Sequence, residues 1–223
     1  CQSPITWMDR FSGKRAMGKY TAQDHPALDE MIEGHIQGIV DAVTTRMQPK
    51  GIILRGSFGR GEGSVVIRNQ QTIFLSDYEI DVVAISPFCR SILRQLTERL
   101  THEYKVHTGL RWIRPDFFSK QRLGPFNVGP APTTISLYES RYGSRTIFGL
   151  DILEKAPKIE PQQIGWESGL FLMLNRMAES MLYMNCDNGA AQDDLLNFYW
   201  INKTILACAE ALLVLWGRTL CTS

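Results

Sequence analysis

The chain has 223 residues, of which 44% are hydrophobic and 21% are charged. These proportions are those of an ordinary globular protein, and they exclude a disordered or fibrous one. Lys and Arg number 24 against 23 Asp and Glu, so the net charge is +1 and gives no reason to expect a nucleic-acid partner.

The cysteine pattern and the hydropathy indicate a cytoplasmic protein. The five cysteines are scattered and form no Cys-x-x-Cys pair, which argues against a disulfide framework or a structural zinc site. The longest apolar stretch, at 205–216, is interrupted by Glu210 and falls short of the roughly 20 residues that span a bilayer. We therefore expect no membrane partner.

The first predicted element is an amphipathic helix over 26–47. Its apolar residues recur every three or four positions, as they do in a helix that buries one stripe. His35 lies on that stripe, so we predict that it packs against a neighbouring element.

The middle of the chain alternates short apolar runs with one further helical pattern. The runs predict strands, and a polar turn between two of them predicts a hairpin. In chain order we predict a strand at 51–55, a hairpin at 65–75, a strand at 76–85, a helix at 86–104 that has Pro87 at its first position and buries Phe88, and a strand at 110–113.

The patterns from 115 to 148 are weaker. Four prolines and two glycines predict a loop over 115–132. The segments 134–138 and 145–148 are predicted as short strands or a turn-linked pair. Together with the preceding elements they indicate a mixed α/β layer.

After Pro161 the composition shifts, and two long helices are predicted over 164–182 and 193–216. Consecutive helices with a short connection form an antiparallel pair, and we expect their methionine-rich face to be core. The chain is thus predicted to have two domains, 1–157 and 158–223, with a homodimer through the helical domain as a further expectation. Whether the helical domain is complete within these residues stays open.

A glycine-rich bend follows the predicted strand at 51–55. Gly56 and Ser57 come first, and three more glycines follow at alternate positions up to Gly63. Such a bend lets backbone N–H groups approach a phosphate closely, and the serine hydroxyl adds a donor. It is neither a Walker loop nor a Gly-x-Gly-x-x-Gly motif, so it predicts a phosphate site only in combination with a second feature.

That second feature is a row of carboxylates on the next predicted strand. Asp77 and Glu79 are two residues apart, so both side chains project from one face, and Asp81 continues the row. Like charges this close are costly unless a cation lies between them. Mg²⁺ takes oxygen ligands, typically one or two carboxylates plus substrate phosphates. The two features together predict phosphoryl or nucleotidyl transfer.

The segments Arg55-Gly-Ser-Phe-Gly-Arg-Gly-Glu62 and Ser76-Asp-Tyr-Glu-Ile-Asp-Val-Val83 together resemble the signature of the DNA polymerase beta-like nucleotidyltransferase superfamily. The resemblance covers about residues 27–153, and the helical remainder is similar to the helical domains of small members such as kanamycin nucleotidyltransferase. It implies an α/β fold of the α+β kind, with a mixed sheet flanked by helices and a C-terminal helical domain. The predicted hairpin at 65–75 accounts for the long gap between Ser57 and Asp77.

The resemblance also implies an activity, the transfer of a nucleoside monophosphate from an NTP to an acceptor hydroxyl on a small molecule, a protein or an RNA. Gly56 and Ser57 would bind the triphosphate. Asp77 and Glu79 would hold two Mg²⁺ or Mn²⁺ ions, which bridge the α-phosphate and stabilise the leaving pyrophosphate.

Arg60 and Glu62 belong to the same glycine-rich segment and are further candidates for nucleotide binding. A guanidinium neutralises phosphate charge well. The alternative, that Arg60 pairs with Glu62 or faces solvent, stays open.

The superfamily usually has a third catalytic carboxylate on the following strand, where this chain has Arg111. Asp116 is the nearest substitute and is our catalytic candidate. Asp81 is an alternative, and Glu167 or Glu179 of the helical domain could supply a base.

Two other interpretations remain. The chain could be a catalytically degenerate member that binds a nucleotide or a partner, as Arg111 suggests. It could also be a purely structural module that binds no nucleotide.

Overall fold

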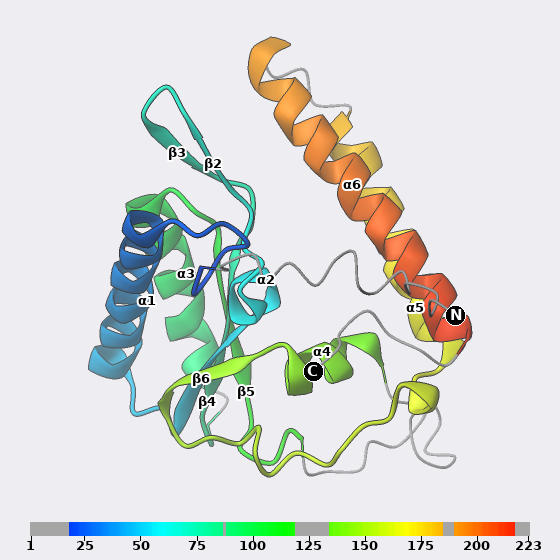
Figure 1. Cartoon of the computed structure of the whole chain (residues 1–223). Coiled ribbons are helices and arrows are strands. Elements are labelled where there is room, and N and C mark those ends of the chain that lie inside the picture. Colours follow the sequence, from blue (N-terminus) through cyan, green and yellow to red (C-terminus); the bar gives the residue numbers. More distant parts are fainter. Residues whose placement is uncertain (1–17, 87, 119–133, 185–189, 217–223) are drawn as a thin grey trace, which may run out of the picture.

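The computed structural model describes residues 18–86, 88–118, 134–184 and 190–216, with the side chains of 183–194 excepted. Its centre is a four-stranded mixed sheet in the order β5-β4-β1-β6 (Figure 1). The strands are β1 (Gly51–Arg55), β4 (Tyr78–Val83), β5 (Thr108–Ile113) and β6 (Arg145–Gly149). β1 pairs antiparallel with both β4 and β6, and β4 pairs parallel with β5.

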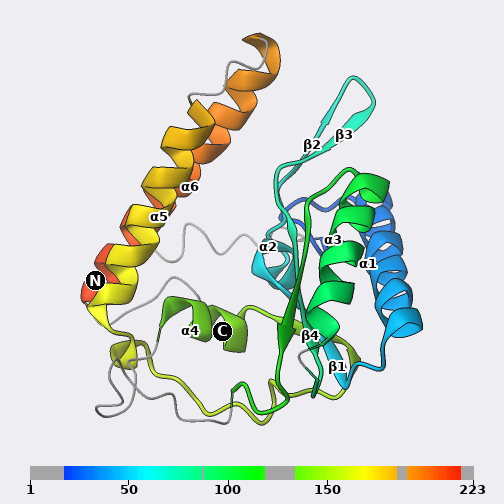
Figure 2. The same cartoon turned by 180° about the vertical axis from the view of Figure 1, so that it is seen from behind.

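One face of the sheet is covered by α1 (Pro26–Arg46) and α3 (Cys89–Tyr104), which lie side by side in Figures 1 and 2. α1 buries the apolar stripe that the sequence predicts. Because strand side chains alternate, every second residue of β4 joins this core, namely Tyr78, Ile80 and Val82. His35 also packs here, with Nδ1 3.0 Å from the Tyr78 hydroxyl and its ring stacked on Tyr104, so its predicted packing is confirmed.

The carboxylate row therefore occupies the opposite face of β4. The register places Glu79 beside Arg55 of β1, and it places Asp81 beside Arg111 of β5. Further along, the same face becomes apolar at Val83 and Ile113, which join a second core cluster. The polar row thus lies at one end of the sheet.

The predicted hairpin is confirmed as β2 (Val65–Arg68) and β3 (Gln71–Phe74), which form a separate two-stranded sheet. It projects from the body of the molecule (Figure 1). Because the hairpin stands outside the main sheet, it lengthens the chain between Ser57 and Asp77 without separating β1 from β4.

The strand predicted at 134–138 is wrong, because this segment begins α4 (Ile135–Tyr142). Thr134 caps the helix, since its side chain accepts a hydrogen bond from the Leu137 backbone N–H. Ile135 and Tyr138 are both buried, three residues apart, which is helical spacing. The predicted loop at 115–132 lies outside the described residues from 119 onward.

The two long helices are confirmed as α5 (Trp166–Met184) and α6 (Ala190–Leu215), preceded by a single 3-10 turn, η3 (Pro161–Gln163). They lie antiparallel and side by side (Figures 1 and 2). Ser180 Oγ and Thr204 Oγ1 are 2.6 Å apart across the pair, and the other end packs on α4 through a cluster that contains Ile135, Tyr138 and Val214.

Two burial predictions fail. The methionine-rich face was expected to be core, but Met177 and Met181 are exposed, the latter by 65%. Phe88 was expected on the buried face of α3 but is 86% exposed, because the helix begins only at Cys89 and its stripe is Leu93, Leu96 and Leu100. Pro87 lies outside the described residues.

One described segment, Leu195–Leu215 of α6, has the length and composition of a membrane-crossing helix, with a mean hydropathy of 1.4. The break expected at Glu210 therefore does not lower the hydropathy of this stretch below that of a possible span. A core helix of a soluble protein meets the same test, so the finding is weak and assigns no location.

Candidate active site

The glycine-rich bend begins where β1 ends. Gly56 has φ of +64°, a left-handed conformation that a residue with a side chain rarely adopts, and it opens the short helix α2 (Gly56–Arg60). The turn is braced by Arg145, whose Nε donates to the Gly59 carbonyl at 2.8 Å. Ser57 is therefore held at the junction between strand and helix.

Glu79 lies directly against this bend. A Cβ built on Gly56 would be 2.6 Å from Glu79 Oε1, so only glycine leaves room for the carboxylate at this position. The two segments meet because Arg55 and Glu79 are paired across β1 and β4. The predicted proximity of the bend to the second carboxylate is thus present in the structure.

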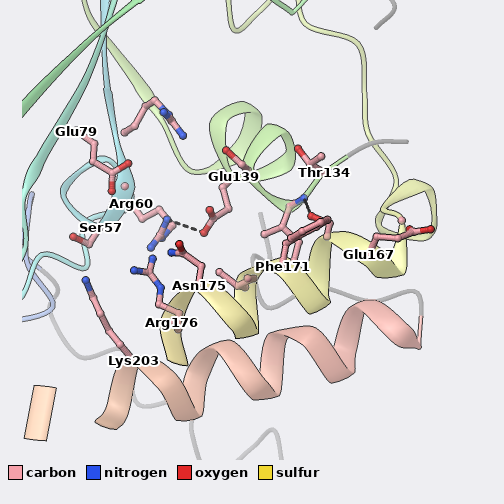
Figure 3. Close-up of a pocket in the computed structure, with 17 residues that line it drawn as sticks. Ser57, Arg60, Glu79, Thr134, Glu139, Glu167, Phe171, Asn175, Arg176 and Lys203 are labelled. Atoms are coloured by element: carbon pink, nitrogen blue, oxygen red, sulfur yellow. Dashed lines mark hydrogen bonds and ion pairs between the residues drawn. The ribbon is translucent and has the colours of Figure 1, made fainter. Parts of the chain in front are cut away.

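Gly56, Ser57 and Glu79 line a cavity of about 610 Å³, which we call the bend cavity (Figure 3). It lies between the sheet and the antiparallel pair α5–α6, which we call the helical hairpin. The cavity's other charged lining residues come from five elements, β1, α2, α4, α5 and α6. They are Arg55, Arg60, Glu139, Glu167, Arg176 and Lys203. Phe171 and Leu172 of α5 add an apolar wall.

Arg60 is shared between two carboxylates rather than exposed to solvent alone. Its Nε donates to Glu62 at 2.7 Å. Its Nη1 donates to Glu139 of α4 at 3.3 Å (Figure 3). Burial raises the pKa of Glu139, while the Arg60 charge opposes that rise and Glu79 adds to it. The expected pairing of Arg60 with Glu62 is present, and Arg60 nevertheless lines the bend cavity.

A second cavity of about 670 Å³ continues past Ser57 and Arg60 toward α6, where Tyr199, Lys203 and Glu210 line it. Burial, with a further contribution from Glu139, raises the pKa of Glu210 to about 7. The helical hairpin therefore closes one side of the site with ionisable groups.

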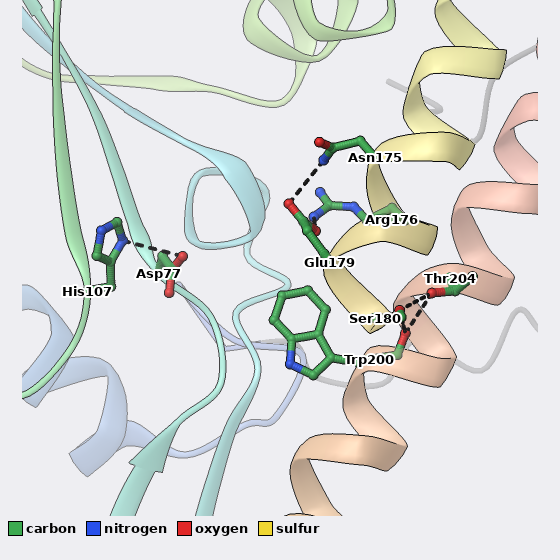
Figure 4. Close-up of polar contacts among 8 residues, drawn as sticks. All are labelled: Asp77, His107, Asn175, Arg176, Glu179, Ser180, Trp200 and Thr204. Carbon is green, nitrogen blue, oxygen red and sulfur yellow. Dashed lines mark hydrogen bonds and ion pairs between the residues drawn. The ribbon is translucent and has the colours of Figure 1, made fainter. Parts of the chain in front are cut away.

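Asp77 is placed differently from Glu79. It precedes β4, its side chain is 59% exposed, and its Oδ2 is 3.5 Å from Nδ1 of His107 (Figure 4). It is not among the residues that line the bend cavity. The structure thus brings Glu79 against the bend and leaves Asp77 outside β4, beside His107.

Asp81 is buried, with only 1% of its surface exposed, and it is ion-paired with two arginines. Arg111 binds it through two hydrogen bonds of 2.7 Å each, from Nε and from Nη2, and Arg55 Nη1 lies 3.5 Å from the same carboxylate. A carboxylate held this way is a structural ion-pair partner and not an open catalytic base. Arg111 therefore stands where the third acid was expected because it neutralises Asp81.

The other acid candidates are scattered. Asp116 accepts from Arg114 Nε at 3.0 Å and lines none of these cavities, and Glu179 is paired with Arg176 at 2.5 Å (Figure 4). Of the predicted alternatives only Glu167 lines the bend cavity.

The described residues contain no group of three or more His, Cys, Asp or Glu side chains that could hold a metal by themselves. The donor set does fit a cation that takes part of its shell from a substrate. Glu79 offers a carboxylate beside the space that the absence of a Cβ at Gly56 leaves, and Asp77, which precedes β4, is the nearest further acid along the chain.

Three residues of the bend cavity were not singled out from the sequence, namely Glu139, Arg176 and Lys203. Glu139 was hidden by the prediction of a strand at 134–138. Arg176 and Lys203 lie on α5 and α6, whose sequences carry no motif. Only the packing of the helical hairpin beside the bend shows that these two residues belong to the site.

A scan against protein-family models, a search of the curated proteins and a search of the solved structures each find no match to this chain. The candidate site therefore rests on its own geometry.

Proposed function

We propose that this chain is a metal-dependent nucleotidyltransferase that moves a nucleoside monophosphate from an NTP to an acceptor hydroxyl. One observation carries the proposal. Glu79 lies against the left-handed Gly56 and shares a cavity with Ser57 and with four basic side chains from β1, α2, α5 and α6. A metal-binding carboxylate in the same cavity as basic side chains is the combination that a metal-bound triphosphate needs.

Arg55 supports the presence of an anionic ligand. Its Nε is buried and has no hydrogen-bond partner among the described residues. A buried guanidinium N–H without an acceptor is costly, and an oxygen of a bound phosphate would satisfy it.

The remaining residues have separate roles in this proposal. Ser57 and the bend bind the outer phosphates, while Arg176 and Lys203 of the helical hairpin neutralise the phosphate charge. Glu139 is a positioning residue, because it accepts from Arg60 and so directs that guanidinium toward the cavity. Asp77 and Glu79 would hold Mg²⁺, which when bound stabilises the developing charge on the phosphate oxygens.

In the transfer itself the acceptor oxygen forms a bond to the α-phosphorus, and the bond from that phosphorus to the pyrophosphate oxygen breaks. The hydroxyl proton is lost to a base. The products are an acceptor–NMP ester, pyrophosphate and the hydroxyl proton, which the base passes to solvent, so atoms and charge balance.

Pyrophosphate release tests the proposal. We expect release with at least one NTP and Mg²⁺ or Mn²⁺, and we expect Glu79→Gln to lower it by at least about a hundredfold, since even outer-shell partners of a metal site are worth ten- to a hundredfold. The fold should survive, because Gln has the same shape as Glu and this side chain is not in the core.

The matched control is Glu154→Gln, which changes an exposed acid outside every cavity described above. It should leave pyrophosphate release unchanged. Normal release from Glu79→Gln, with circular dichroism equal to that of the unchanged chain, would reject the proposal.

A second candidate function is nucleotide binding without transfer. It is favoured by the bidentate Arg111–Asp81 pair, which leaves β5 without a carboxylate at this end of the sheet. Metal-independent NTP binding by calorimetry, with no pyrophosphate released, would support this function over the first.

A further inference from the structure

A third cavity, of about 720 Å³, opens beside the edge strand β5 and the helix α3. Four arginines line it, and we call it the arginine cavity. They are Arg55 of β1, Arg90 and Arg94 of α3, and Arg111 of β5.

Two of these arginines are exposed and carry charge that no carboxylate of the described residues pairs with. Arg55 and Arg111 share Asp81, but among the described residues Arg90 and Arg94 form no ion pair. They lie four residues apart on one helix face, where like charges repel and destabilise the helix. Arg90 stacks over Trp112 with its guanidinium carbon 4.7 Å from the ring centre, which directs it along the cavity wall. A bound anion would relieve this repulsion.

The position of the arginine cavity relative to the bend cavity is informative. Arg55 and Glu79 line both, so the two cavities adjoin at these two residues. Phosphoryl transfer needs the attacking and leaving oxygens roughly in line on opposite sides of phosphorus. A triphosphate in the bend cavity and an acceptor in the arginine cavity would be neighbours at Arg55 and Glu79, which such a transfer requires.

We propose that the arginine cavity is the acceptor site and that the acceptor is a small molecule carrying a phosphate group, held by Arg90 and Arg94. This inference rests on the proposed nucleotidyltransferase function. The guanidinium fork matches phosphate oxygens in pairs, and the acceptor hydroxyl is then presented toward Glu79.

Size and charge favour a small acceptor over a nucleic acid. A volume of about 720 Å³ is that of a small-molecule pocket. The whole chain carries a net charge of only +1, whereas nucleic-acid binding normally depends on a broad basic surface.

The test is calorimetry on the full chain with saturating Mg²⁺ and a non-hydrolysable NTP analogue, so that the bend cavity is filled first. The probes are ribose 5-phosphate, with ribose as its uncharged counterpart. We expect ribose 5-phosphate to bind and ribose not to bind. Arg90→Gln together with Arg94→Gln should weaken ribose 5-phosphate by about tenfold or more, since charged hydrogen bonds are worth more than about 1.4 kcal/mol each.

The matched control is Arg99→Gln, an exposed arginine of α3 that lines none of the three cavities, and it should leave the ribose 5-phosphate affinity unchanged. Binding of the NTP analogue should be the same in all these variants. The inference fails if ribose 5-phosphate does not bind, if Arg90→Gln with Arg94→Gln leaves its affinity unaltered, or if a short single-stranded oligonucleotide binds more tightly at the same arginines. If the NTP analogue itself fails to bind, it is the proposed function that fails, so the two failures are distinguishable.

Discussion

Asp81 and Arg111 show how one residue can change the meaning of a motif. The sequence predicts a row of three acids, but only Glu79 of them lines the bend cavity. Asp77 lies before β4 beside His107, and Arg111 and Arg55 enclose Asp81. A buried carboxylate that loses its cation is left with an uncompensated charge. The pair therefore stabilises this end of the sheet and fixes how Arg55 lies.

We expect Arg111→Met to lower the free energy of unfolding by about 2 kcal/mol or more, which is less than the loss of a fully buried pair because the Arg111 side chain is 46% exposed and Arg55 remains. Urea denaturation measures the change. Arg114→Met is the control, since the Arg114–Asp116 pair is largely exposed and should be worth no more than about 1 kcal/mol. Equal losses from the two substitutions would contradict this account of Asp81.

Among the elements, the junction of β1 with α2 is the part of the site that the sequence predicts best. A buried apolar strand running into Gly-Ser predicts a bend, and the structure has a left-handed glycine there. The contact between Gly56 and Glu79 adds a second requirement for glycine, which comes from β4 and not from the bend itself.

We expect Gly56→Ala to destabilise the protein by about 1–2 kcal/mol, the cost of a left-handed residue with a side chain, and to reduce pyrophosphate release because the added Cβ displaces the Glu79 carboxylate. Gly34→Ala is the matched substitution in α1, where a Cβ meets no other atom within 4 Å. It should instead raise stability by about 0.5–1 kcal/mol. Thermal unfolding and the pyrophosphate assay check both, and full release from Gly56→Ala would show that Glu79 does not need its present position.

The helix α4 is the element on which the sequence misleads. Thr134-Ile135 is β-branched and local propensity favours a strand, but Thr134 caps a helix whose apolar side packs against α6 and the 159–164 segment. Tertiary packing outweighs propensity in so short a segment. The error matters because it hides Glu139, which the helix directs toward Arg60.

At the scale of the whole molecule, the bend cavity is assembled from residues more than 140 positions apart. Ser57 lies on the sheet side of the cavity and Lys203 lies on α6 (Figure 3). The helical hairpin is held in this position by its packing on α4. The two long helices are predicted correctly, but no sequence pattern shows which of their polar positions face the bend.

If the helical hairpin supplies phosphate-binding charge, Lys203→Met should reduce the rise in melting temperature produced by an NTP with Mg²⁺. The stability of the free protein should change little. Lys158→Met removes an equal charge at an exposed site outside the three cavities and should leave this rise intact. An unchanged rise in melting temperature in Lys203→Met would show that Lys203 of the helical hairpin does not contact the nucleotide.

The sequence by itself determined the mixed sheet, the hairpin at 65–75, the two long helices and the glycine-rich bend after β1, because residue periodicity and glycine-rich bends are local signals. The register of β1 and β4 then brings Glu79, and not Asp77, against the bend. Only the tertiary structure decided that Asp81 belongs to Arg111, that Glu139 and Lys203 face the bend, and that arginines of α3 and β5 gather beside Glu79. Those relations depend on the order and register of strands and on helix packing, which join residues distant in the chain and leave no mark on its local pattern.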